Sequence, residues 1–209
     1  SAISADKITI SPSADGKSQT ISWPVVMGAS SYRVNLIDLG NPNEPIINDS
    51  IVDGCSVTGK REEDVNYKLT ILPLGNTKKG NTDATEVTSK EFSTFTPTFK
   101  TIPTGSDLNE WFAANPVPDD SIGRNLNYDL EAGGSYTISA ALDFDAHWVT
   151  LRSNSKSNPA TITYTDATSC INFAAPFNVK YLHFDCAGMA ANIGVFGFSK
   201  EPTAARDEA

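Results

Sequence analysis

The densest group of side chains that could do chemistry lies at residues 143–147, DFDAH. If this segment is a strand with Phe144 pointing inward, Asp143 and Asp145 project from the same face about 7 Å apart. Asn172 is expected beside them if the chain winds into stacked coils, as argued below. Two carboxylates and an amide oxygen suit calcium. Asp143, Asp145 and Asn172 are therefore the candidate metal ligands, the alternative being that both carboxylates are solvated or cap a corner.

The two histidines, His147 and His183, could in principle supply a neutral imidazole base. Their positions beside Trp148 and between two apolar residues are more typical of packed histidines, so no catalytic residue is predicted. The chain contains no nucleophile elbow, phosphate-binding loop, dinucleotide fingerprint or HExxH motif. No organic cofactor is expected, and calcium is the one cation that the residues suit.

Two tryptophans could offer flat apolar faces to sugar rings. Trp148 is opposite in phase to Val149 and is the predicted ligand-binding residue, because it is expected to face outward. Trp111 lies on the apolar stripe of a short helix and is expected in the core.

The charge and cysteine content exclude several classes of protein. Sixteen basic and twenty-five acidic residues give a net charge of -9, which repels nucleic acid and anionic lipid. The apolar runs are too short for a membrane span. Cys55, Cys170 and Cys186 form no CxxC pair and are expected to be buried thiols, with a Cys170 to Cys186 bridge as the alternative.

The first 95 residues predict a small β-sandwich. Seven short runs with alternating apolar residues are separated by turn signals. The stretch ISWPVVMGASSYRVNLID, with Trp23 and Tyr32, and the stretch VNYKLTIL, with Tyr67, resemble the fibronectin type III family. That family usually has leucine where this chain has Arg61, so the resemblance leaves the packing near Tyr67 open.

A linker and a capping helix are predicted next. Residues 96–106 are rich in Thr and Pro and lack periodicity, which indicates a linker. From Asp107 a helix of about two turns is expected, because Asp107 and Glu110 have the spacing of a capping box. Its apolar residues share one face that must pack on another element.

Residues 107–209 predict stacked coils of strand. Apolar runs recur at ragged offsets that place Ile138 on Ile162 and Leu151 on Leu182, as in a solenoid whose loops vary. The six residues 154–159 between two of these runs suit a corner better than a hairpin. The stretch FNVKYLHF resembles a rung of the pectin-lyase-like right-handed β-helix.

The expected fold class is therefore all-β, with a fibronectin type III-like sandwich at 1–95, a linker at 96–106, and a capping helix with the first coils of a β-helix at 107–209. Since a solenoid needs about three repeats and a cap, the coils are expected to be truncated. Their open edge would pair with a second copy or with further coils of the same protein.

The pair of domains resembles modular surface proteins of Gram-negative gut anaerobes that accompany polysaccharide-degrading systems. This resemblance implies a secreted or cell-surface location, including the outer membrane, and a polysaccharide or glycan partner. Three functions stay open: glycan binding or presentation without catalysis in this segment, the amino-terminal part of a polysaccharide lyase or glycosidase, and a structural adhesin-like stalk.

Overall fold

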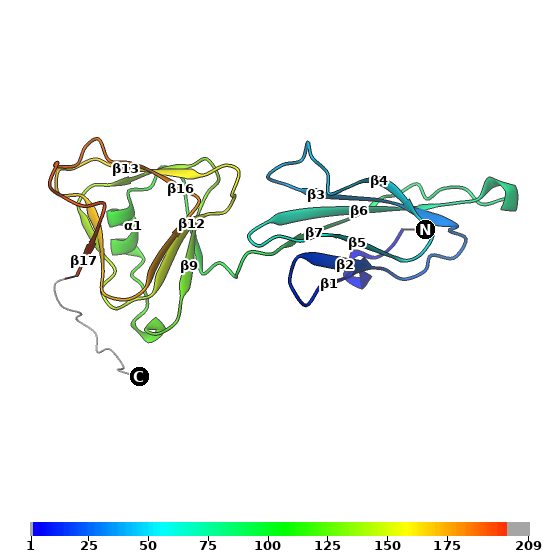
Figure 1. Ribbon diagram of the computed structural model, residues 1–209, viewed down its shortest axis with the longest axis horizontal. Helices are drawn as coiled ribbons and strands as arrows, with labels where there is room; N and C mark the ends of the chain where they lie inside the picture. The colour runs from blue at the N-terminus through cyan, green and yellow to red at the C-terminus, as the bar shows by residue number, and fades with distance from the viewer. Residues whose placement is uncertain (1, 200–209) are drawn as a thin grey trace. The chain divides into compact units, whose positions relative to one another are not determined.

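The chain is all-β and divides into two compact units, Ser1–Phe95 and Thr96–Ala209 (Figure 1). The structure is a computed structural model that describes residues 2–199. Of the coils predicted at 107–209, residues 200–209 lie outside the described residues. No helix between residues 2 and 199 is long and apolar enough to cross a membrane.

The first unit contains the seven predicted strands in two antiparallel sheets. One sheet has the order β1-β2-β5 and the other the order β4-β3-β6-β7. The strands are β1 (Thr9–Pro12), β2 (Ser18–Ser22), β3 (Ser31–Asp38), β4 (Ile47–Val52), β5 (Ser56–Lys60), β6 (Asn66–Leu74) and β7 (Thr88–Ser93). Two 3-10 turns, η1 (Ala5–Lys7) and η2 (Thr77–Lys79), complete the unit.

Aromatic residues dominate the core of the first unit. Trp23 and Tyr32 are buried and meet edge to face with 5.4 Å between ring centroids. The Tyr67 hydroxyl accepts a hydrogen bond from the backbone N–H of Glu62 at 2.9 Å. Arg61 donates from Nη1 to Oε1 of the buried Gln19 at 3.2 Å, so a polar contact stands where the family resemblance led us to look for leucine.

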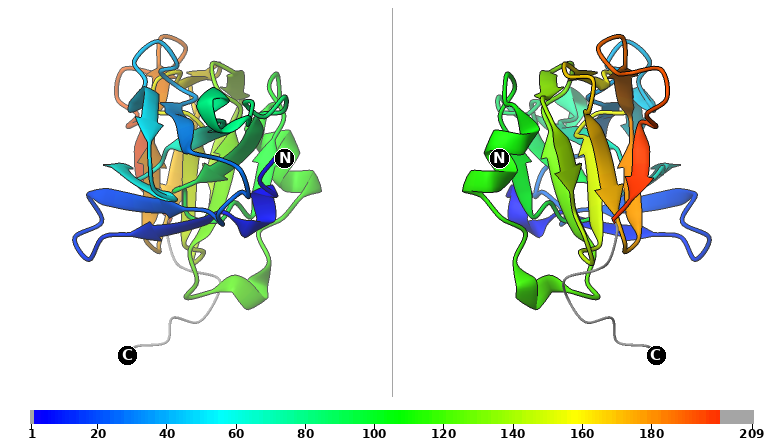
Figure 2. Two further views of the ribbon diagram at one scale, coloured as in Figure 1. Left: turned by 90° about the vertical axis from the view of Figure 1, so that its right-hand side faces the viewer. Right: turned by 90° about the vertical axis from the view of Figure 1, so that its left-hand side faces the viewer.

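The second unit passes repeatedly through three parallel sheets, whose orders are β8-β9-β12-β15, β10-β13-β16 and β11-β14-β17. Strand β8 comes first, and the three passes that follow it in the described residues each contribute one strand to each sheet. Figure 2 shows strands of successive passes side by side, from green through yellow to red. The strands are β8 (Lys100–Ile102), β9 (Leu126–Leu130), β10 (Ser135–Ile138), β11 (Ala141–Asp143), β12 (Val149–Ser153), β13 (Ala160–Tyr164), β14 (Cys170–Phe173), β15 (Phe177–Lys180), β16 (Leu182–Asp185) and β17 (Phe196–Phe198).

In the two runs on either side of residues 154–159, alternation predicts that Val149, Leu151, Ile162 and Tyr164 point into the second unit. Val149, Leu151, Ile162 and Tyr164 are fully buried. The connector between β12 and β13 is a corner, because these two strands belong to different sheets. The apolar alternation changes phase between Val179 and Leu182, which predicts a bend near Tyr181. The structure has this bend, since Tyr181 has a φ of 58° and separates β15 from β16.

The residue pairs between neighbouring passes differ from those that the recurring apolar runs predicted. Ile162 lies beside Tyr136, and Ile138 lies beside Tyr164, so the predicted Ile138 and Ile162 pair is wrong by two residues. Leu151 pairs with Val179, while Leu182 belongs to another sheet. The corners between strands differ in length, so the number of residues that separates paired positions changes from one sheet to the next. A single sequence offset therefore cannot describe all three sheets.

Two further expectations are corrected. Residues 96–106 are not an unstructured linker, because β8 pairs with β9 in parallel register and the whole segment belongs to the second unit. Cys55, Cys170 and Cys186 are free thiols and only half-buried. Cys170 begins β14 while Cys186 follows β16 in a different sheet, so the alternative bridge is absent.

A helix covers the beginning of the second unit. Helix α1 (Leu108–Ala114) starts at Asp107, whose side chain accepts a hydrogen bond from the Glu110 N–H at 3.1 Å, as predicted. Leu108 and Phe112 are buried. The Phe112 ring meets that of Phe144 edge to face at 4.9 Å, so α1 closes the first pass of the chain. A 3-10 turn, η3 (Asp119–Ser121), follows.

A buried ion pair fastens the start of the second unit to its sheet. Arg152 on β12 is fully buried, and its Nε donates to Oδ1 of Asp129 on β9 at 2.6 Å. Its other nitrogens donate to the Oγ1 of Thr96 at 2.7 Å and to the Thr96 carbonyl at 2.6 Å. Thr98 donates from Oγ1 to the second oxygen of Asp129 at 2.6 Å. Residues 96–98 are therefore held before β8 begins.

Replacing Arg152 by methionine is expected to destabilise the protein by about 3 to 5 kcal/mol, because it leaves the Asp129 carboxylate buried and unpaired. Urea unfolding followed by circular dichroism measures the free energy of unfolding. The double variant Arg152→Met with Asp129→Leu should recover part of the loss.

The matched control is Arg33→Met, which breaks an ion pair of 3.6 Å whose side chains are 46% and 60% exposed. That change should cost less than about 1 kcal/mol. If Arg152→Met and Arg33→Met lowered the free energy of unfolding equally, the stabilising role of the buried pair would be contradicted.

Candidate functional site

The predicted metal ligands are brought together only in part. Asp143 lies beside Asn172 in the register of β11 and β14. Asp145 lies past the end of β11 with a φ of 52°, and its N–H donates to Oδ1 of Asp143 at 2.8 Å. Asp143 also accepts a hydrogen bond from the Ser199 hydroxyl. The Asp143 carboxylate thus organises the turn that leaves the strand.

These three residues fit calcium poorly. Calcium takes six to eight oxygen ligands, whereas the amide oxygen of Asn172 already accepts from the Cys170 thiol at 3.6 Å and is covered by Gly197. Within residues 2–199 no three His, Cys, Asp or Glu side chains form a group that could hold a metal. We derive no chemistry through calcium, and the calcium site stays a prediction.

The predicted ligand-binding residue Trp148 is half-buried. Its indole Nε1 is buried and has no hydrogen-bond partner among the described residues. The neighbouring His147 places Nδ1 3.1 Å from the Phe144 carbonyl and Nε2 3.4 Å from the Asp119 carboxylate, so it is a packed histidine, as expected. His183 lies on β16, in a different sheet from the strands that flank His147, and the two histidines form no common site.

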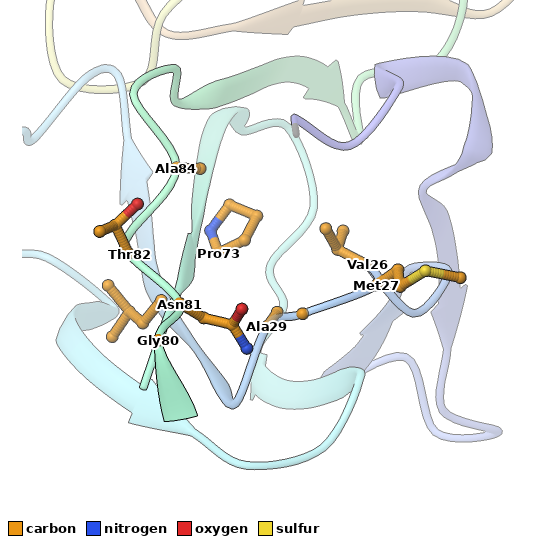
Figure 3. A pocket seen from close by; sticks show the side chains of 10 residues that line it. Val26, Met27, Ala29, Pro73, Gly80, Asn81, Thr82 and Ala84 are labelled. Atoms are coloured by element: carbon orange, nitrogen blue, oxygen red, sulfur yellow. The ribbon is translucent and has the colours of Figure 1, made fainter. Parts of the chain in front are cut away.

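A hollow of about 240 Å³ lies in the first unit, between residues 26–29, the end of β6 and residues 80–84 (Figure 3). It is lined by Val26, Met27, Gly28, Ala29, Pro73, Leu74, Gly80, Asn81, Thr82 and Ala84. None of these side chains carries a charge, so the hollow offers no acid and base pair. It is also smaller than the roughly 300 to 1,000 Å³ typical of small-molecule sites.

A group of aromatic and polar side chains at β8 and α1 of the second unit offers more groups for binding a ligand than the hollow does. We call Phe99, Lys100, Trp111 and Asn115 the cap platform. Phe99 is 41% exposed, Trp111 is half-buried and Lys100 is exposed. The Lys100 ammonium lies 5.8 Å from the Phe99 ring centroid and 6.0 Å from that of Trp111. The cap platform therefore combines two aromatic rings, a cation and an amide.

A buried tyrosine supports the two aromatic rings. Tyr128 on β9 meets Phe99 edge to face at 5.6 Å and Trp111 edge to face at 5.9 Å. Burial raises the pKa of Tyr128 to about 12, so its hydroxyl stays neutral. Tyr128 is fully buried and packs against both rings, while Phe99 and Trp111 remain partly exposed.

Strand register and the end of α1 set the positions of Lys100 and Asn115. The register of β8 places Lys100 beside Tyr128. Asn115 ends α1, and its backbone N–H and side-chain Nδ2 both donate to the Trp111 carbonyl, at 2.8 and 3.0 Å. The Asn115 amide oxygen accepts a long hydrogen bond of 3.4 Å from Lys100. The end of the helix is thus joined to the edge strand.

The cap platform can bind a ligand that has both an apolar face and polar groups. Exposed aromatic rings offer apolar area at small entropic cost, and an ammonium and an amide donate hydrogen bonds. The sequence analysis missed this group because it assigned Trp111 to the core and residues 99–100 to a linker. The signal available was Phe99-Lys100 preceding a helix that carries Trp111 and ends at Asn115.

Comparison with known proteins adds a family. The chain matches the DUF4992 family, whose description is "Domain of unknown function", over residues 2–133, and it belongs to that family. No curated protein matches its sequence.

Among solved structures, the chain is similar to pectate lyase PelI from Erwinia chrysanthemi in complex with tetragalacturonic acid. The two share 13% identity with a TM-score of 0.30, and the match covers 86% of this chain and 76% of that one. A likeness of this size carries no argument about activity.

The helix that carries Trp111 should lose stability in acid through Asp107. Burial acts to raise the pKa of Asp107, but hydrogen bonds from Ser139, the Glu110 N–H, Thr137 and the Asn109 N–H outweigh it and lower the pKa. A carboxyl with a lowered folded pKa stabilises the fold above its unfolded pKa of about 3.9, and this contribution disappears as the pH falls through the folded pKa.

The variant Asp107→Asn keeps an N-cap side chain but cannot titrate. Wild type should be the more stable protein at about pH 6, and the difference should shrink toward about pH 2. Urea unfolding across this range gives both free energies of unfolding. A difference that does not change with pH would contradict the role assigned to the Asp107 charge.

Proposed function

We propose that the first unit is a fibronectin type III-like sandwich and that the second is the start of a right-handed, pectin-lyase-like β-helix. The strand orders β1-β2-β5 and β4-β3-β6-β7 support the first assignment, together with the hydrogen bond between the Tyr67 hydroxyl and the Glu62 N–H, which resembles a tyrosine corner. Three parallel sheets visited in turn support the second.

On this scaffold, the protein is a secreted or cell-surface module that binds a polysaccharide or glycan and carries no catalysis in this segment. The observation that carries this proposal is the cap platform. In it, Phe99 and Trp111 pack against Tyr128, beside a lysine and an asparagine. Sugar rings have apolar faces and polar edges, so a site with aromatic rings and hydrogen-bond donors matches both.

The arrangement favours a polymer over a small enclosed ligand. The members of the cap platform come from β8 and the residue before it and from α1 and the residue after it, and all four are at least partly exposed. An open surface with two neighbouring rings can contact successive sugars of a chain. Individually weak contacts then add along the polymer.

Removing one ring from the cap platform should weaken glycan binding about tenfold or more, equivalent to about 1.4 kcal/mol. The variants are Phe99→Ala and Trp111→Ala, and affinity electrophoresis against a panel of plant and microbial polysaccharides measures binding. Circular dichroism melting of each variant separates lost binding from lost folding.

The matched control is Phe198→Ala, since Phe198 is 83% exposed on β17 of the same unit and is not part of the cap platform. Its binding should equal that of wild type. If wild type binds no polysaccharide in the panel, the proposal is wrong and the adhesin-like stalk gains support. Release of soluble, ultraviolet-absorbing fragments from a polymer would favour the polysaccharide lyase alternative.

A further inference from the structure

Lys100 is an exposed cation that has no carboxylate partner within the described residues. Its ammonium reaches only the Asn115 amide oxygen, at 3.4 Å, and the two aromatic rings. Arg152 and Arg124 in the same unit contact Asp129 and Asp120 instead. Lys100 therefore retains hydrogen-bonding capacity that a ligand could use.

The contact of Lys100 with the aromatic rings leaves hydrogen-bond donors of its ammonium available. Cation–π attraction acts within about 6 Å of a ring centroid and is weak at an exposed site. The distances of 5.8 and 6.0 Å lie at the outer limit of this range. A lysine ammonium has three donors, and only one donates to the protein, through a long hydrogen bond to Asn115.

The position of the charge beside the rings selects the kind of ligand. A sugar ring in van der Waals contact with Phe99 or Trp111 lies about 4 Å from the aromatic plane, so a substituent on that sugar falls within reach of Lys100. A charge-assisted hydrogen bond to an anionic substituent is about twice as strong as one to a hydroxyl. The cap platform thus offers more to an anionic sugar than to a neutral one.

We infer that the cap platform selects glycans whose sugars carry a carboxylate or a sulfate ester, and that Lys100 is the residue that recognises this charge. The inference rests on the proposed glycan-binding function and adds its ligand class. It holds despite the acidic character of the unit, in which residues 96–199 contain ten acidic and five basic side chains. Repulsion from distant exposed charges is screened beyond about 8 Å at physiological salt, whereas Lys100 acts at contact.

Matched pairs of polymers test the inference. Polygalacturonate is compared with its neutral methyl ester, and a sulfated galactan with its desulfated backbone, by affinity electrophoresis. Wild type should bind the charged member of at least one pair about fivefold more tightly, in line with an exposed ion pair of up to about 1 kcal/mol. The preferred pair shows whether the anion is a carboxylate or a sulfate ester. The preference should shrink as sodium chloride rises from about 0.05 M to about 0.5 M.

Lysine variants assign the preference to one residue. Lys100→Gln should remove the preference for the charged polymer, and Lys100→Arg should restore most of it. Lys78→Gln is the matched control, because Lys78 is an exposed lysine of the first unit. It removes the same charge from the net total and should leave the preference intact.

The outcomes separate this inference from the proposal beneath it. Equal binding of charged and neutral polymers, lost on Trp111→Ala but unaffected by Lys100→Gln, would overturn the charge selection and keep the glycan function. A charge preference that Lys78→Gln lowers as much as Lys100→Gln would also overturn it, because the general field would then be responsible. Absence of binding to every polymer would overturn both.

Discussion

The buried contact between Arg152 and Asp129 holds the beginning of the second unit in place. It joins β12 to β9, and the remaining guanidinium donors fix Thr96. With residues 96–98 anchored, β8 continues directly into parallel register with β9. Because two buried charges need nearly ideal partners, this network tolerates few alternative positions of the segment. The location of Phe99 and Lys100 follows from it.

Helix α1 supplies the other half of the cap platform. Its N-terminus is anchored through Asp107, which accepts hydrogen bonds from Glu110 and Thr137. Its buried face packs over the first pass through Leu108 and Phe112. A helix of two turns has little stability alone, so its orientation depends on this packing. Trp111 stays only partly exposed because the apolar face of the helix must pack on the first pass.

The position of the proposed binding surface also has a structural cause. The strands of a repeated parallel arrangement bury their apolar side chains against the passes on either side. The first pass has no preceding pass, and here α1 and β8 cover it. Elements that close an end need fewer side chains for the core than interior strands do, so aromatic and polar residues there are free to face solvent. The four residues of the cap platform all lie on these two closing elements or next to them.

The sequence alone determined the local features of this protein. The all-β class, the seven strands of the first unit, the N-cap at Asp107, the bend at Tyr181 and the inward direction of Leu151 and Ile162 follow from alternation and capping, which act over a few residues. The tertiary structure alone decided the register between passes, the strand β8 within an apparent linker, the burial of Arg152 and the half-exposed position of Trp111. These features depend on contacts between segments about 20 to 60 residues apart, and on corner lengths that no single sequence period describes.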